Sequence, residues 1–454
     1  MVAKGYGLEV MVIDDQGAPG GQIWRSVELT DRRDDILGPS YVDGRKVAEA
    51  FRASGVTYQP NTQLWQVEPG YRAFVSRDKQ AQVIEAKAIL LATGAQERPV
   101  PFQGWTLPGV LTVGAAQILL KNAGQVPTEP VWIAASGPLP LLYTMQLLRA
   151  GGQVAGYIDT TPAGQWRDAI RHLPRALGAA SELVKGLGWT LNLRAGKTQF
   201  IAGVTEIRAL GDKRLKELQF RKGNGAFVTV KATTLLVHEG VVPNIHAALA
   251  LDCKVEWNLS QDCFAPVLDG WGETSRSNIF IAGDGAGIGG AKAALLRGKI
   301  AALRIAQKLG FVAEGEDLTV ATPLRRKLDR ELAVRPFLDA MFRPRRQIFE
   351  PADDTIVCRC EEVTAGVVRK LALVGQPGPN QIKAVTRAGM GPCQGRQCGY
   401  SITRILAAAQ RRAPADVGFV HFRPPLKPVT LGELASLDWD DAHLDRAEIP
   451  SDFE

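Results

Sequence analysis

Histidine is scarce in this 454-residue sequence, and no pair of histidines stands at a spacing typical of catalysis or metal binding. Long apolar runs are also missing, since no stretch reaches the ~18 consecutive apolar residues that a transmembrane helix needs. The first residues, MVAKGYGLEVMVIDD, lack the regions of a signal peptide. We therefore expect a soluble, cytoplasmic protein without a membrane span. The five histidines, each interpreted as a surface or packing residue, are His172, His238, His246, His421 and His443.

Charge and cysteine content are equally modest. The 54 basic and 47 acidic residues leave a net charge of +7, which does not require nucleic acid as a partner. Six cysteines in so long a chain do not form a disulfide scaffold. The composition, with 45% apolar and 22% charged residues, excludes wholesale disorder. The length predicts about three domains.

Repeated patterns of strand, glycine-rich turn and helix predict an α/β fold with dinucleotide-binding, Rossmann-like domains. The first pattern is an apolar strand, residues 8–13, that ends at Asp14. An acid at the end of the second strand of such a unit binds the adenosine ribose. The first strand and the G-x-G-x-x-G loop do not precede it, so this first βα unit is truncated. Either Met1 is an internal methionine of a longer natural chain, or cofactor binding at this site has been lost.

Two further strand ends predict contacts with a flavin. In the segment AILLATGAQE (88–97), an apolar strand leads into Thr93 and Gly94. Small residues after a buried strand allow close approach of a ligand. SNIFIAGDGAGIGG (277–290) is a strand that ends at Gly283 and Asp284, followed by a helix from about residue 291. The Asp284 carboxylate can bind sugar-alcohol hydroxyls, and the helix N-terminus can face a flavin ring. The alternative for Asp284 is a helix cap.

The segment 130–159 predicts a second dinucleotide fold. It reads as strand, turn, helix and strand, with Ser136 and Gly137 in the loop and Asp159 at the end. Two of the three usual glycine positions hold Ala135 and Pro140. We expect weakened or altered nucleotide binding, with a purely structural role and an adenine nucleotide both left open.

Four cysteines give the sharpest chemical pattern. Cys358 and Cys360 form one pair, Cys393 and Cys398 form the other, and 32 residues separate the pairs. Four thiolates can hold zinc or an iron–sulfur cluster, and unligated thiols are the third reading. Glycines around the second pair leave backbone N–H groups free for cluster sulfurs, and the neighbouring dinucleotide folds imply redox work. Both features favour a [2Fe–2S] centre.

Taken in order, ATGAQERPVPFQGWTLPGV, IFIAGD and CRCEEVT…AGMGPCQGRQCG resemble a known family. The chain is similar to the large (alpha) subunit of bacterial multi-subunit FAD-dependent amino-acid and opine dehydrogenases. That group includes octopine and nopaline oxidases, hydroxyproline dehydrogenase and hydrogen cyanide synthase. The cysteine segment resembles the [2Fe–2S] domain of the bacterioferritin-associated ferredoxin type. The resemblance implies two dinucleotide-binding domains of the disulfide-reductase type and a small helical [2Fe–2S] domain.

Residue by residue, the resemblance implies one flavin site and one cluster. For FAD, it implies Asp14, the loop Gly20, Gly21 and Gln22, then Thr93, Gly94, Gly283 and Asp284. The cluster ligands are Cys358, Cys360, Cys393 and Cys398. A second nucleotide site at Ser136, Gly137 and Asp159, or an intersubunit site, would take an adenine nucleotide or FMN.

The resemblance also implies partners and a role. A smaller, FAD-containing beta subunit oxidises the amine substrate, a small ferredoxin-like gamma subunit is a further candidate, and this chain relays electrons. The complex would lie in the cytoplasm, or at the periphery of the inner membrane through its electron acceptor. The alternatives are a stand-alone NAD(P)H-dependent flavin oxidoreductase and a non-catalytic scaffold.

The patterns also predict domain limits. The FAD domain comprises 1–129 and 265–310, and the second nucleotide domain 130–264. A helical linker (311–352), the [2Fe–2S] domain (353–412) and an extended C-terminal tail (413–454) follow. The tail is interpreted either as an arm on a neighbouring subunit or as a partly ordered terminus.

Overall fold

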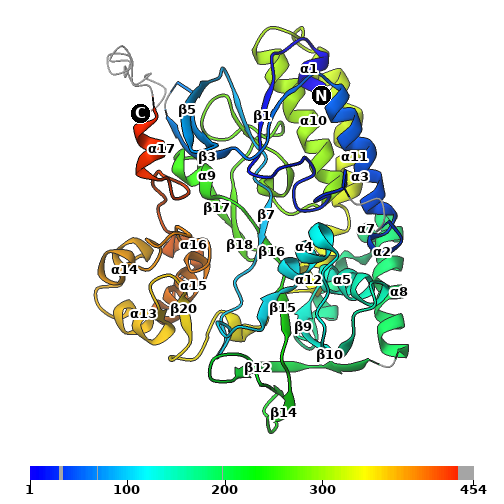
Figure 1. Ribbon diagram of the computed structural model, residues 1–454, viewed down its shortest axis with the longest axis vertical. Coiled ribbons are helices and arrows are strands. Elements are labelled where there is room, and N and C mark those ends of the chain that lie inside the picture. The colour runs from blue at the N-terminus through cyan, green and yellow to red at the C-terminus, as the bar shows by residue number, and fades with distance from the viewer. Residues whose placement is uncertain (30–33, 69, 197, 438–454) are drawn as a thin grey trace.

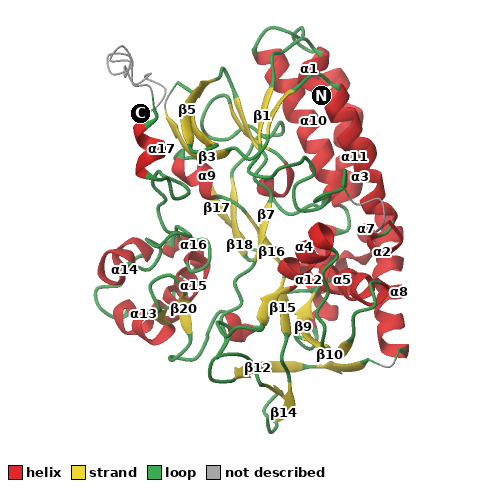
Figure 2. Ribbon diagram, in the orientation of Figure 1, coloured by secondary structure: helices red, strands yellow, loops and turns green. Residues whose placement is uncertain are grey.

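A computed structural model describes residues 1–29, 34–68, 70–196 and 198–437. Figure 1 shows an upper part with small sheets and long helices, a lower part around a parallel sheet, and a small module at one side. Figure 2 shows that this side module is almost entirely helical. No helix of the described residues is long and apolar enough to cross a membrane.

The lower part is built on five parallel strands in the order β11-β10-β9-β15-β8. All six residues of the central strand β9 (Val131–Ser136) are buried, as expected for a parallel strand covered on both faces. Gly156 makes room for the Trp132 ring, because a Cβ on residue 156 would lie 2.2 Å from it. The other strands are β8 (Val110–Thr112), β10 (Val154–Asp159), β11 (Gln199–Ala202) and β15 (Leu235–Glu239).

Each face of this sheet has its own apolar core. On one face, Ile133 and Leu236 pack with α4 (Val113–Ala123) and α5 (Pro138–Arg149). On the other, Trp132 packs against an antiparallel sheet. Burying each large apolar side chain contributes about 1.5–3 kcal/mol. The remaining elements of this part are β12 (Val204–Leu210), β13 (Glu217–Lys222), β14 (Val228–Lys231), α2 (Asp34–Leu37), α6 (Gln165–Ala169), α7 (Leu173–Ala176) and α8 (Ala180–Ala195).

In the upper part, the parallel strands form two separate pairs. β1 (Met11–Ile13) pairs with β2 (Thr57–Gln59), and β6 (Ile89–Leu91) pairs with β19 (Ile279–Ile281). No strand of the described residues joins the two pairs. The rest of the upper part comprises α1 (Val2–Gly5), α3 (Pro39–Ala53), β3 (Gln63–Glu68), β4 (Arg72–Arg77), β5 (Gln80–Glu85) and α10 (Ala291–Lys308).

A short antiparallel ladder connects the two parts. The chain leaves β15, turns at Gly240 and forms β16 (Val241–Pro243), which pairs with β7 (Ala95–Glu97). β7 directly follows the loop that contains Thr93 and Gly94. The loop beside β6 and the end of the parallel sheet are therefore held by the same ladder. The elements that follow β16 are α9 (His246–Ala250), β17 (Val255–Asn258) and β18 (Cys263–Pro266).

The linker is helical and is anchored to the parallel sheet. α11 (Glu316–Leu332) and α12 (Arg335–Met341) lead to Arg345, whose guanidinium lies 2.6 Å from the Glu239 carboxylate. Only 3% of the Arg345 side chain and none of the Glu239 side chain are exposed. Gln347 adds two hydrogen bonds, of 3.1 and 2.9 Å, to the backbone of Ile207.

The side module contains all four predicted ligand cysteines and has its own core, in which Ile402 and Leu406 are fully buried. After the module, the chain returns to the upper part. The Leu426 N–H donates to the Trp65 carbonyl at 2.7 Å, and Ser436 accepts a 2.8 Å bond from the Ala81 N–H. The predicted tail thus lies against its own chain as far as residue 437, and 438–454 lie outside the described residues. The last elements are β20 (Ile356–Cys358), β21 (Val363–Thr364), α13 (Ala365–Ala372), α14 (Pro379–Thr386), α15 (Gly399–Gln410), α16 (Pro414–Val417) and α17 (Leu431–Ala435).

Replacing Arg345 by Met should lower the free energy of unfolding by about 3–5 kcal/mol, because it leaves a buried, unpaired carboxylate at Glu239. The double variant Glu239→Leu/Arg345→Met should recover most of this loss. Arg346→Met is the matched control, since its partner Glu350 and Arg346 itself are exposed, and its loss should stay below about 1 kcal/mol. Urea unfolding measures all three, and equal losses for Arg345→Met and Arg346→Met would contradict the expectation.

Candidate flavin and cysteine sites

The structure brings together four of the predicted flavin contacts. Thr93 and Gly94 lie in the loop after β6. We call this loop together with β7 the flavin loop (residues 92–97), after the predicted cofactor. Gly283 and Asp284 lie in the turn after β19. A Cβ on Gly285 would lie 3.4 Å from the Gly94 carbonyl oxygen and 3.5 Å from the Thr93 hydroxyl. The two predicted motifs are therefore direct neighbours.

Asp284 binds the loop that leads into the next helix. One of its carboxylate oxygens accepts 2.9 Å hydrogen bonds from the N–H groups of Gly289 and Gly290, just before α10 begins at Ala291. Arg297 on α10 donates to the Gly283 carbonyl at 3.0 Å. The N-cap of α10 is Gly290, so Asp284 is not the helix cap itself, although it binds the residues just before the helix. The sugar-binding reading of Asp284 stays a prediction.

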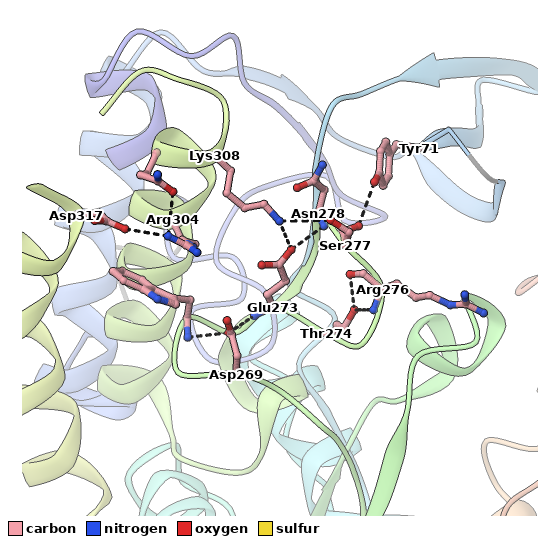
Figure 3. A network of polar contacts seen from close by, with 12 residues as sticks. Tyr71, Asp269, Glu273, Thr274, Arg276, Ser277, Asn278, Arg304, Lys308 and Asp317 are labelled. Atoms are coloured by element: carbon pink, nitrogen blue, oxygen red, sulfur yellow. Dashed lines mark hydrogen bonds and ion pairs between the residues drawn. The ribbon is translucent and has the colours of Figure 1, made fainter. Parts of the chain in front are cut away.

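A polar network fixes the strand that leads to Asp284 (Figure 3). Glu273 accepts a 2.8 Å hydrogen bond from the Asn278 N–H and forms an ion pair with Lys308 on α10. The Tyr71 hydroxyl donates to the Ser277 carbonyl at 3.1 Å. These contacts tie the start of β19 to the C-terminal end of α10 and to the turn between β3 and β4, so the strand that leads to Asp284 is anchored at its start.

Asp14 lies at the end of β1, as predicted. Its carboxylate accepts hydrogen bonds from the Gln16 N–H at 2.9 Å and from the Tyr58 hydroxyl at 3.2 Å. Burial raises the pKa of Asp14, and the hydrogen bonds oppose that shift. The adjacent Asp15 forms an ion pair with Lys427 of the returning C-terminal segment.

The predicted loop Gly20, Gly21 and Gln22 lies against α4. Lys121 of that helix donates 2.9 Å hydrogen bonds to the carbonyls of Gln22 and Ile23. Gly20 has a φ of +125°, and a Cβ there would lie 2.4 Å from the Trp24 carbonyl oxygen, so glycine is required. The backbone of this loop is thus held by α4.

The second predicted nucleotide site lies at the C-terminal edge of the parallel sheet. Ser136 ends β9, Gly137 caps α5, and the Asp159 carboxylate accepts a 3.0 Å bond from the Thr161 N–H. The Ser136 hydroxyl is buried and has no hydrogen-bond partner within the described residues. Pro138 and Pro140 remove two N–H donors from the first turn of α5, where a pyrophosphate would bind.

His238 has a buried partner that the sequence did not indicate. Its Nδ1 lies 2.7 Å from the Glu97 carboxylate, and only 3% of the His238 side chain is exposed. The other Glu97 oxygen accepts the Gly114 N–H of α4 at 3.0 Å. The usable signals were the acid three residues after Gly94 of the ATG motif and the histidine near the end of an apolar strand.

The four cysteines of the side module are free thiols that meet across the two sequence pairs. Cys398 hydrogen-bonds to Cys358, and this contact lowers the Cys358 pKa to about 6 against the effect of burial. Cys360 lies next to Cys393, and burial raises the pKa of Cys360. Further donors to Cys358 are the backbone N–H groups of Gly389, Glu361 and Cys360.

Glycines shape the cysteine loop, residues 389–398. A Cβ on Gly391 would lie 2.3 Å from the Cys360 Cβ, so only glycine fits there. Four sulfur donors, neighbouring backbone N–H groups and a closely approaching glycine backbone are what an iron–sulfur centre requires. Within the described part of the chain, however, no three His, Cys, Asp or Glu side chains are placed to hold a metal ion. The predicted centre is therefore not shown.

One hydrogen bond joins the flavin loop to the cysteine loop, and a second set of contacts lies beside the two loops. The Gln96 side chain donates a 2.9 Å hydrogen bond to the Arg396 carbonyl. His246 lies 2.8 Å from the Asn244 side chain, and its ring centre lies 4.1 Å from that of Phe422. Burial, aided by the charge of Arg396, lowers the His246 pKa to about 3, so this ring is neutral. Sequence patterns did not indicate either contact.

Comparison with known proteins decides the family. The model for "Pyridine nucleotide-disulphide oxidoreductase" matches residues 1–310, and that for "Sarcosine oxidase A3 domain" matches 356–437. The chain belongs to the pyridine nucleotide-disulphide oxidoreductase family. This confirms the predicted mixed α/β fold of the disulfide-reductase type and the prediction of a FAD-dependent oxidoreductase.

The sequence similarity to two relatives covers nearly the whole of this chain. An opine oxidase subunit of Rhizobium meliloti (strain 1021) is 42% identical over 440 residues, which cover 95% of this chain and 94% of that protein. The hydrogen cyanide synthase subunit HcnB of Pseudomonas aeruginosa is 30% identical, with 95% and 94% covered. The crystal structure of L-proline dehydrogenase from P. horikoshii shares the fold, with a TM-score of 0.68 and 19% identity over 95% of this chain and 76% of that one.

Replacing Lys121 by Met should change how stability depends on pH. Burial, aided by Arg25, lowers the Lys121 pKa to about 8, whereas an unfolded lysine titrates near 10.4. Between these values the unfolded chain binds more protons, so wild-type stability should rise with pH relative to Lys121→Met, by at most about 1.4 kcal/mol per pH unit. Urea unfolding of both proteins measures the difference, and a constant difference across this window would contradict the assignment.

Proposed function

We propose that the chain is the electron-transferring flavin and iron–sulfur subunit of a hetero-oligomeric dehydrogenase. The complex would oxidise an amino acid, imino acid or opine at the carbon next to nitrogen. The observation that carries this proposal is the direct contact between the flavin loop and the cysteine loop, from Gln96 to Arg396. The names of the relatives, opine oxidase and hydrogen cyanide synthase subunits, support this class of reaction.

FAD would be held mainly by the neighbouring Thr93–Gly94 and Gly283–Asp284 motifs, with Asp14 and the loop Gly20, Gly21 and Gln22 as further contacts. A Cβ on Gly94 would meet no atom within 4 Å, so the loop has room for a ligand.

Cys358, Cys360, Cys393 and Cys398 would bind a [2Fe–2S] cluster. The four cysteines lie together in the side module as two contacting pairs, with backbone N–H donors to Cys358, and this supports the assignment. The cluster exchanges single electrons, whereas a flavin accepts two, so together they divide a hydride equivalent into single-electron steps. Zinc remains the competing ligand for the same four sulfurs.

Partner chains would perform the oxidation itself. A smaller FAD-containing beta subunit and a small ferredoxin-like gamma subunit are the proposed partners, and the relatives' names as subunits support an assembly of this kind. The cytoplasmic location stays a prediction. The C-terminal edge of the parallel sheet, with Ser136, Gly137 and Asp159, would take an adenine nucleotide, and an FMN would bind there or between subunits.

A stand-alone NAD(P)H-dependent oxidoreductase is the second candidate. It needs a competent pyrophosphate loop, and Pro138 and Pro140 both withhold N–H donors from the helix start that would form it. This observation disfavours NAD(P)H as the reductant. A non-catalytic scaffold would retain the folds and bind zinc.

Replacing Cys393 by Ser in the complex, co-produced with its partner subunits, should abolish the broad iron–sulfur absorption and lower iron per chain, because one of four thiolate ligands is lost. Flavin bands should remain. Cys253→Ser is the matched control, since Cys253 is buried outside the side module and its replacement should leave the iron content unchanged. Unchanged iron in Cys393→Ser, or zinc in a colourless protein, would contradict the proposal, and bleaching of the flavin by NADH alone would support the second candidate.

A further inference from the structure

We infer that Gln96 and His246 are positioning residues that hold the flavin loop against the cysteine loop, so that electrons pass between the two cofactors at this contact. We call the contact, formed by Gln96, Asn244, His246, Arg396 and Phe422, the electron-transfer seam. The inference rests on the proposed function and adds where in this chain the transfer occurs.

The first connection in the seam is a single hydrogen bond. Gln96 is two residues from Gly94, and the carbonyl that it binds, on Arg396, is two residues from Cys398. The Arg396 guanidinium in turn donates to the Cys393 carbonyl at 3.2 Å and to the Leu426 carbonyl at 3.1 Å. One 2.9 Å bond therefore joins the flavin loop to the backbone between two cluster ligands.

The second connection runs from the flavin loop to Gly395 of the cysteine loop. The Asn244 N–H donates to the Gly94 carbonyl at 2.9 Å, and the Thr93 hydroxyl donates to the Asn244 carbonyl at 3.1 Å. The Asn244 side chain holds His246 at 2.8 Å, and the His246 ring meets the Phe422 ring edge-on. Phe422 packs over the cysteine loop, where a Cβ on Gly395 would lie 3.5 Å from its ring.

These contacts fix relative position because they are buried and specific. Only 3% of His246 is exposed, and the ring is neutral, so it can pack against Phe422 without burying a charge. The two connections leave the flavin loop at different residues and reach the cysteine loop at different residues. Such paired contacts restrict rotation of the side module relative to the flavin loop, so the distance between the two cofactors would stay fixed.

The electron balance of the transfer is simple. Two electrons leave the reduced flavin one at a time, and its two protons pass to solvent. Each electron crosses the seam to the iron centre, which must be reoxidised by an external one-electron acceptor before the next arrives. Ferricyanide serves as that acceptor in the experiment below.

The experiment uses the full complex and two variants. Gln96→Met keeps the side-chain length but loses the N–H donor, and His246→Phe keeps a ring but loses the contact with Asn244. Gln103→Met is the matched control, because Gln103 also bonds to the side module, at Asp354, but away from the cysteine loop. A photochemically reduced deazaflavin delivers one electron to the flavin, and absorbance follows its transfer to the iron centre; ferricyanide turnover is recorded in parallel.

We expect Gln96→Met and His246→Phe each to slow the internal transfer several-fold, with FAD and iron per chain unchanged and Gln103→Met at the wild-type rate. Wild-type transfer rates in Gln96→Met with both cofactors bound would overturn the inference. Gln96 is partly exposed, so this variant decides the question if His246→Phe does not fold. Absence of flavin or iron from the wild-type complex would instead overturn the proposed function, and this inference with it.

Discussion

The ladder between β7 and β16 is the constraint on which both sites depend. It contains only three residue pairs, Val241 with Glu97, Val242 with Gln96, and Pro243 with Ala95. Because successive side chains of a strand point to opposite sides, Glu97 reaches His238 and the start of α4, while Gln96 reaches the cysteine loop. A single short strand thus links the parallel sheet, the flavin loop and the side module.

Local patterns were enough to predict the elements that carry the motifs. The strand before Thr93 and the helix that begins at Ala291 were predicted correctly because each depends on an apolar run followed by small residues. Asp284 shows the limit of such patterns, since one of its oxygens binds the two N–H groups just before α10 while Gly290 is the N-cap of that helix. The iron–sulfur centre and the individual cofactor contacts stay predictions.

Contacts between distant residues were outside the reach of sequence patterns. Spacing joined Cys358 to Cys360 and Cys393 to Cys398, whereas in space Cys358 meets Cys398 and Cys360 meets Cys393. His238 and Glu97 are 141 residues apart, so the sequence offered His238 no partner. Such pairings are set by how sheets and helices stack, and a single sequence reveals only the burial that they require.

The side module is attached to the rest of the chain at both of its ends. Before it, the Arg345–Glu239 ion pair fastens the incoming segment, and after it, the Leu426–Trp65 hydrogen bond fastens the outgoing one. A unit tethered twice cannot diffuse away when its surface contacts open, and its effective concentration at its own docking face stays on the order of millimolar. Separation and return of the module are then events within one molecule, independent of how dilute the protein is.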